Sequence, residues 1–182
     1  MKRSRTLMFA CALGCVSGSA HATVVVPVNL EELAHDARTI VRGEVVALDA
    51  RWTDDRRRVE TLVTLEAESY LKGPLGSLLQ FRVPGGQLGR FRSIFIGAPT
   101  LTVGQRIVVF LGARGPSIPY VLGLSQGVFH VVAAVDGWTV ESPVIVPATA
   151  QPGRIVRGDP ARRPTPLADF ERQVRQLSEA SR

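Results

Sequence analysis

Hydrophobic and polar positions alternate most regularly between residues 58 and 72. One side of this pattern is mainly apolar and the other is mainly charged. The apolar side contains Val59, Thr61, Val63, Leu65 and Ala67, and the polar side contains Arg58, Glu60, Thr64, Glu66 and Glu68. Because successive side chains of a strand point to opposite faces, this period of two predicts one long strand with one buried face.

Further strands are predicted where apolar and β-branched residues cluster between turns, at residues 39–48, 78–83, 106–112, 120–124, 128–135 and 138–141. Gly43 lies inside the first of these strands and predicts a bulge or a sharp bend. Residues 51–57 predict the polar tip of a hairpin, and Asp136-Gly137 predicts a two-residue hairpin turn. Short strands joined by glycine-containing turns favour a barrel or a sandwich, and the long, bent early strands favour the barrel.

Two helices flank the predicted strands. Residues 28–34 predict a short helix with Asn29 as its N-cap. A second helix is predicted with Thr165 as its N-cap and Pro166 as its first helical residue. Its apolar stripe is made by Leu167, Phe170, Val174 and Leu177. We expect this stripe to pack on the barrel, and the alternative is that it binds a partner.

The fold class that these elements predict is mainly all-β. We expect an OB-like antiparallel β-barrel, closed or partly open, at residues 23–141. Prolines and arginines dominate residues 142–166, which predicts a linker or an extended strap. An amphipathic helix is expected to follow at residues 167–180.

The N-terminal residues predict export. Three basic residues within residues 1–5 precede an apolar run at residues 7–16, and small residues follow. This order is typical of a cleavable signal peptide, here residues 1–22, and the apolar run is about half as long as a membrane span. The mature chain would begin at Thr23, be periplasmic or extracellular, and keep no stable membrane anchor. The alternative is lipidation of Cys15.

Removal of this signal changes the charge and the cysteine content. The whole chain has 22 lysines and arginines and 16 acidic residues, and the mature chain would keep 19 basic residues, a net charge of +3. Both cysteines, Cys11 and Cys15, would leave, which excludes disulfides and thiolate chemistry from the mature chain. Arg56-Arg57-Arg58 directly follows Asp54-Asp55, so we expect a solvated loop there. Without a long basic run or many aromatic residues, no nucleic-acid partner is predicted.

The segment Gly123-Leu124-Ser125-Gln126-Gly127 matches the G-x-S-x-G pattern of serine hydrolases. In α/β-hydrolases this pentapeptide turns from a strand into a helix. Here a strand pattern follows it, and the next histidine, His130, lies within that strand. We therefore expect an ordinary hairpin turn, with a serine hydrolase as the weaker alternative.

Other chemistry-bearing residues are sparse. His35 and His130 are far apart and lack the spacing of metal ligands. Glu66 and Glu68 share one face of a strand and are expected to be solvated. Glu44 and Arg42 are expected to form an outward salt bridge. The sequence therefore predicts no catalytic residue, no metal and no cofactor.

The order of three short motifs resembles a known family. The motifs are VRGEV at residues 41–45, Lys72-Gly73-Pro74, and Val103-Gly104 followed by residues 108–111. In this order they resemble the netrin-like (NTR) modules, which include the N-terminal domain of the tissue inhibitors of metalloproteinases. The chain is also similar to a group of exported bacterial proteins with a PGG loop, a GAP segment and a C-terminal helix. The resemblance covers residues 24–135 and implies an OB-like five-stranded barrel.

The same resemblance implies a second function. In the inhibitors, the amine and carbonyl of an N-terminal cysteine chelate the zinc ion of the protease. Here Thr23 and Val24 would form the mature N-terminus, without a cysteine. The resemblance thus makes a metalloprotease inhibitor the alternative to a general binding module.

Residues 83–99, VPGGQLGRFRSIFIGAP, combine glycines with arginines. A phosphate cradle would need a helix to begin after the glycines, but β-like apolar residues follow. Pro84-Gly85 fits a type II turn, so we expect a long loop or an irregular hairpin beside the barrel. The candidate partner-binding surface contains Arg82, Arg90, Phe91 and Arg92. The expected function is an exported, non-catalytic binding module for an unknown protein or small-molecule ligand.

Overall fold

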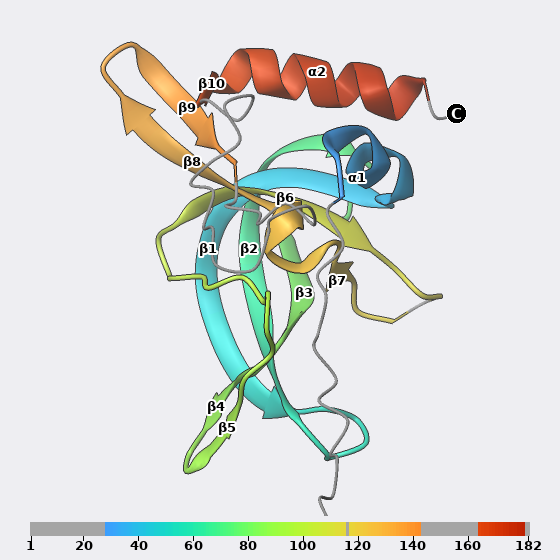
Figure 1. Cartoon of the computed structure of the whole chain (residues 1–182), viewed down its shortest axis with the longest axis vertical. Coiled ribbons are helices and arrows are strands. Elements are labelled where there is room, and N and C mark those ends of the chain that lie inside the picture. The colour runs from blue at the N-terminus through green and yellow to red at the C-terminus, as the bar shows by residue number, and fades with distance from the viewer. Residues whose placement is uncertain (1–27, 116, 143–163, 181–182) are drawn as a thin grey trace, which may run out of the picture.

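The structure is a computed structural model that describes residues 28–115, 117–142 and 164–180. The predicted signal peptide, Thr23 and Val24, and nearly all of the predicted linker at residues 142–166 lie outside the described residues. Within the described part, two helices lie at one end of a curved set of strands, as Figure 1 shows.

A closed five-stranded barrel forms the body of the molecule, which confirms the predicted OB-like fold class. Its strands are β1 (Thr39–Trp52), β2 (Val59–Lys72), β3 (Leu78–Pro84), β6 (Arg106–Gly112) and β7 (Tyr120–Val121). Strand β2 pairs antiparallel with β1 and β3, and β6 pairs antiparallel with β1 and β7. The barrel closes where Arg82 of β3 pairs in parallel with Tyr120 of β7.

The predicted strand at residues 120–124 is shorter than expected. It ends at Val121, and the 3₁₀ helix η1 (Leu124–Gly127) follows. Strands β7 and β8 (Val128–Ala134) both pair with β6 and not with each other. The 3₁₀ helix η1 therefore connects two strands that share one partner, whereas a hairpin turn would connect two strands that pair with each other. The hairpin turn expected at Gly123–Gly127 is therefore wrong.

The hairpin predicted near Asp136-Gly137 is present. Strand β8 pairs antiparallel with β9 (Gly137–Glu141), and Ala134 lies opposite Gly137. The two loop residues are thus Val135 and Asp136, one position earlier than the sequence predicted. This hairpin projects past the barrel toward the C-terminal helix (Figure 1).

The interior of the barrel is filled by aliphatic residues and one phenylalanine. They are Val41, Val45, Val63, Leu65, Leu79, Phe81, Val83, Ile107, Val109, Leu111, Val121 and Val128. The pairing of β1 with β2 shifts register between Arg42 and Gly43, which confirms the predicted bulge. At Gly43 the strands approach so closely that a Cβ atom would overlap the backbone carbonyl oxygen of Glu66.

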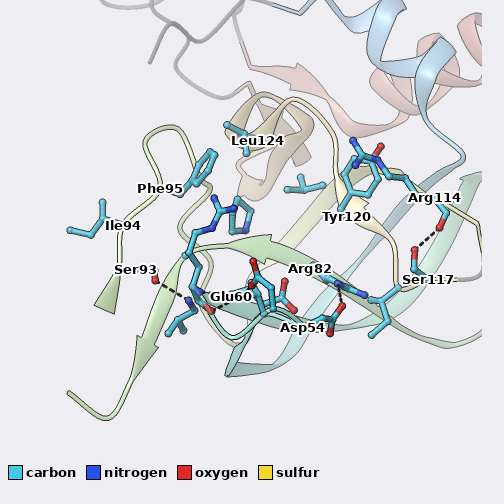
Figure 2. A pocket seen from close by; sticks show the side chains of 18 residues that line it. Asp54, Glu60, Arg82, Ser93, Ile94, Phe95, Arg114, Ser117, Tyr120 and Leu124 are labelled. Atoms are coloured by element: carbon cyan, nitrogen blue, oxygen red, sulfur yellow. Dashed lines mark hydrogen bonds and ion pairs between the residues drawn. The ribbon is translucent and has the colours of Figure 1, made fainter. Parts of the chain in front are cut away.

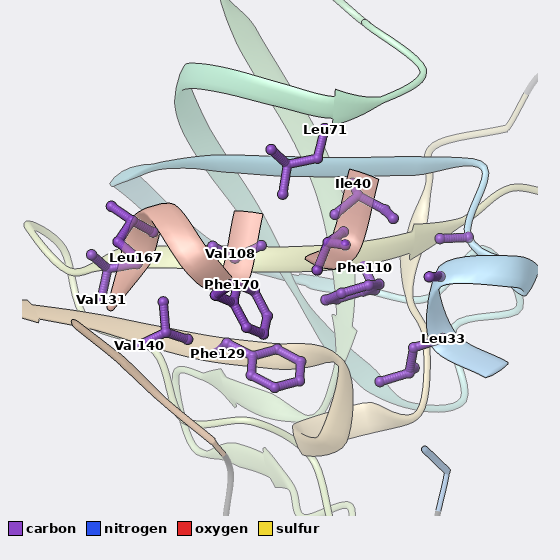
Figure 3. Close-up of a cluster of buried hydrophobic side chains, with 13 residues drawn as sticks. Leu33, Ile40, Leu71, Val108, Phe110, Phe129, Val131, Val140, Leu167 and Phe170 are labelled. Carbon is purple, nitrogen blue, oxygen red and sulfur yellow. The ribbon is translucent and has the colours of Figure 1, made fainter. Parts of the chain in front are cut away.

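A second hydrophobic core lies outside the barrel, beneath α1 (Leu30–Asp36) and α2 (Leu167–Glu179). The Phe129 ring lies 5.5 Å from Phe110 and 4.9 Å from Phe170, centroid to centroid, and so joins the barrel wall to α2 (Figure 3). Phe170 and Val174 are buried there. The predicted docking of the C-terminal helix is therefore confirmed.

The two helix starts differ in how well the sequence predicted them. At α1 the Asn29 side chain accepts a hydrogen bond from the Glu32 N–H, and Glu32 bonds back to Asn29, as a capping box does. At α2 the predicted cap is wrong. Thr165 and Pro166 form the short strand β10, which pairs with β9, and the helix begins at Leu167. Pairing with β9 takes the backbone of Thr165 out of the capping position.

Candidate functional site

A groove with a volume of about 970 Å³ opens at the end of the barrel that bears the β1–β2 turn. It is bordered by residues 53–55 and 58–60, the end of β3, residues 93–95 and the β6–β7 connection (Figure 2). Pockets that hold ligands commonly have volumes of about 300–1,000 Å³. The groove is therefore large enough to take a ligand or a segment of a partner.

The groove presents apolar and aromatic side chains to solvent. Ile94 is 77% exposed and lies at the outer rim, and Phe95 is 39% exposed. Opposite them, the Arg114 guanidinium lies 5.5 Å from the centroid of the Tyr120 ring, in a cation–π arrangement. Leu124 of η1 completes this apolar surface.

Two ion pairs involve charged residues of the groove. Arg82 Nη1 donates to Asp54 Oδ2 over 3.2 Å. Glu60 is 7% exposed, and its Oε1 accepts from Arg51 at 2.9 Å. Glu60, which the alternation placed on the polar side of the strand, is thus buried. Arg51 and Glu60 are directly opposite in the hairpin, and this ion pair lets the carboxylate be buried.

The glycine- and arginine-containing stretch forms a short hairpin beside the barrel, as predicted. Its strands are β4 (Gly86–Leu88) and β5 (Phe91–Ser93). Thr61 donates its hydroxyl to Gly85 O at 2.8 Å, and Ser93 Oγ accepts from the Val59 N–H at 2.8 Å. These two bonds hold the hairpin against β2.

The predicted partner-binding residues fall into two groups. Arg82 lines the groove, whereas Arg90, Phe91 and Arg92 are exposed on the hairpin. Arg92 borders a different groove of about 530 Å³, and Arg90 stacks over the Phe91 ring at 5.3 Å. Thr23 and Val24, the other candidates, lie outside the described residues. The structure thus brings together three of the six.

The G-x-S-x-G segment forms hydrogen bonds with two distant parts of the chain, at Gly97 and Val28. The Ser125 N–H donates to Gly97 O at 2.9 Å, and the buried Gln126 side chain accepts from the Val28 N–H at 2.8 Å. In the described part of the chain, Ser125 makes no hydrogen bond to a histidine or a carboxylate. His130 Nδ1 instead lies 2.6 Å from Gln105 Nε2.

The outer carboxylates belong to a network of ion pairs. Arg42 Nε lies 3.3 Å from Glu171 and 3.5 Å from Glu68, so it ties β1 to α2. Glu68 also accepts from Arg106 Nε at 2.8 Å, and Glu44 lies 3.5 Å from Arg106. Glu44 is therefore paired with Arg106 and not with Arg42, and Glu68 is not simply solvated.

Titratable groups show few perturbations in the residues that the structure covers. Burial lowers the pKa of His130 from its ordinary value of 6.5, against the opposing effect of Glu141. A hydrogen bond from Thr53 lowers the pKa of the exposed Asp55. Across residues 28–115, 117–142 and 164–180, no group of three or more potential ligands is arranged to hold a metal ion.

Sequence reasoning missed several groove residues. Arg51 and Glu60 could have been paired by counting outward from the turn at residues 53–58. Arg114 and Tyr120 gave no comparable signal, because the β6–β7 connection brings them to the groove only once β7 pairs with β3.

No family model matches this chain, and no curated protein matches it at a significant level. Among the described residues, no helix is both long and apolar enough to cross a membrane.

Proposed function

We propose that this protein is an exported, non-catalytic interaction module that binds a segment of a partner protein in the barrel-end groove. The observation that carries the proposal is the exposure of Ile94 and Phe95 beside Arg114 and Tyr120. Large apolar side chains next to arginine and tyrosine are typical of the energetic centres of protein interfaces.

The pairing of the charged residues of the groove supports this function. Asp54 neutralises Arg82, and Arg51 neutralises Glu60. A partner that enters the groove therefore meets apolar rims and two ion pairs, together with the buried Arg82 Nε, which has no hydrogen-bond partner among the described residues. Its affinity would come mainly from burying Ile94 and Phe95, each worth about 1.5–3 kcal/mol when fully buried.

The test compares two exposed aliphatic residues. The protein purified after export is immobilised and exposed to the exported proteins of its own source, as wild type, Ile94→Arg or Leu78→Arg. Leu78 is 63% exposed at the opposite end of β3 from the groove. A partner retained by wild type and Leu78→Arg but lost with Ile94→Arg is the expected result. Equal retention by all three proteins would reject the groove as the binding site.

A second candidate function is inhibition of a zinc metalloprotease through the mature N-terminus. It is favoured by the hydrogen bond from the Val28 N–H to Gln126, which holds the first described residue of the chain against η1. The netrin-like assignment is part of this proposal, and the closed five-stranded barrel supports it. Removal of residues 23–27 should abolish inhibition, and failure of the intact protein to inhibit any zinc metalloprotease would end this candidate.

A further inference from the structure

Two turns lie at one end of the molecule, and the residues at and beside them include four exposed arginines and two aromatic rings. One is the β1–β2 turn, and the other is the β4–β5 turn. In Figure 1 both lie at the end opposite α1 and α2. We call this surface the basic tip, and it contains Trp52, Arg56, Arg57, Arg90, Phe91 and Arg92.

An aromatic contact joins the two turns. The Trp52 and Phe91 rings pack edge to face, with centroids 5.1 Å apart. They are 36% and 48% exposed, so both keep part of their surface in solvent. Arg90 lies over the outer side of this pair, 5.3 Å from the Phe91 centroid. The tip therefore combines aromatic surface with exposed guanidinium groups, one of which lies over an aromatic ring.

The arginines of the tip outnumber the carboxylates beside them. Arg56, Arg57, Arg90 and Arg92 are exposed, and none of them forms an ion pair with another described residue. Two carboxylates, Asp54 and Asp55, lie in the same β1–β2 turn. Asp54 pairs with Arg82, and Asp55 accepts from the Thr53 hydroxyl and the Arg57 N–H. Among the described residues of the tip, four exposed guanidinium groups thus face one carboxylate, that of Asp55, and the excess positive charge can bind an external anion.

We infer that the basic tip docks reversibly on a membrane surface rich in anionic phospholipid. Guanidinium groups bind phosphate oxygens in a bidentate manner. Exposed tryptophan and phenylalanine beside arginine are typical of side chains that lie at the level of lipid headgroups. The tip consists of two projecting turns, which a flat lipid surface can contact together.

An acidic protein would satisfy the arginines but gives no role to the aromatic pair at their centre. A phospholipid surface accounts for both the arginines and the aromatic pair, because its phosphates lie next to the boundary of its acyl chains. This inference is independent of the barrel-end groove, because no residue of the tip lines that groove. Arg92 lines the smaller groove of about 530 Å³.

The experiment measures sedimentation of the exported protein with vesicles made of equal parts phosphatidylglycerol and phosphatidylcholine. An arginine near an anionic surface contributes about 5-fold to the partition coefficient, so Arg90→Gln with Arg92→Gln should reduce binding roughly 30-fold. The matched control is Arg38→Gln with Arg172→Gln, which removes the same charge near α1 and in α2. We expect the control pair to bind as wild type does.

A second variant tests the aromatic part. Phe91→Ala should weaken binding by an amount that persists at high salt, whereas the arginine effect should fade with salt. Three outcomes would overturn the inference. They are equal binding to vesicles of phosphatidylcholine alone, losses no greater than those of the control pair, or retention on polyglutamate without any binding to vesicles.

Discussion

Because β1 approaches β2 closely at Gly43, we expect the substitution Gly43→Ala to lower the stability of the protein. A Cβ atom at this buried position would overlap the carbonyl oxygen of Glu66 and lie 3.0 Å from Leu65 Cγ. The carbonyl belongs to the backbone of a paired strand, so it cannot turn aside as a side chain can. Overpacking of this kind costs about 1–3 kcal/mol, and weakening of the adjacent ladder adds about 1 kcal/mol. We therefore expect a loss of about 3 kcal/mol in the free energy of unfolding.

The assay is urea unfolding, followed by circular dichroism, with thermal unfolding as a second measure. For a chain of this size the loss corresponds to a fall in Tm of about 6–12 °C. Gly89→Ala is the matched control, because a Cβ atom there meets nothing within 4 Å and only the positive φ of 57° opposes it. That strain costs about 1 kcal/mol. A Gly43→Ala protein that loses no more stability than Gly89→Ala would refute the close approach.

Two further predictions concern the outer core and His130. Phe170→Ala should lower the free energy of unfolding by about 3–5 kcal/mol, because the ring is 5% exposed and packs on Phe129. The control, Arg172→Ala at an exposed position of α2, should change the free energy of unfolding by less than about 0.5 kcal/mol. Equal effects of the two substitutions in urea unfolding would contradict the docking of α2. Burial lowers the pKa of His130 below 6.5, so the unfolded chain binds more protons than the folded chain just below that pH. Stability should therefore fall as the pH drops through 6.5, and an unaltered pH profile in His130→Asn would count against this.

The strands that the sequence predicted best are those whose pattern is local. Alternation across β2 needed only one buried face, and Gly43 indicated a bulge because no other residue fits so close a crossing. Thr165 was misread because its role depends on β9, which lies more than twenty residues earlier in the chain. A cap and a strand end require similar residues, and only tertiary pairing decides between them.

The site was harder to predict for a related reason. The groove is assembled from five segments, and its position depends on the parallel pairing of Arg82 with Tyr120. Two strands paired in this way are not joined by a tight turn, so no turn residues in the sequence indicate the pairing. The arginines at positions 90 and 92 were recognised as exposed candidates, but their separation from Arg82 follows from the course of the β4–β5 hairpin. Composition can name these residues, whereas topology decides which of them share a surface.

The most direct test of the binding groove is photo-crosslinking inside cells that export the protein. A photoreactive amino acid is introduced in place of Ile94 in one variant and in place of Leu78 in another. We predict a discrete covalent adduct with one partner protein from position 94 and none from position 78. No adduct at position 94, or the same adducts from both positions, would contradict the assignment of the barrel-end groove as the partner-binding site.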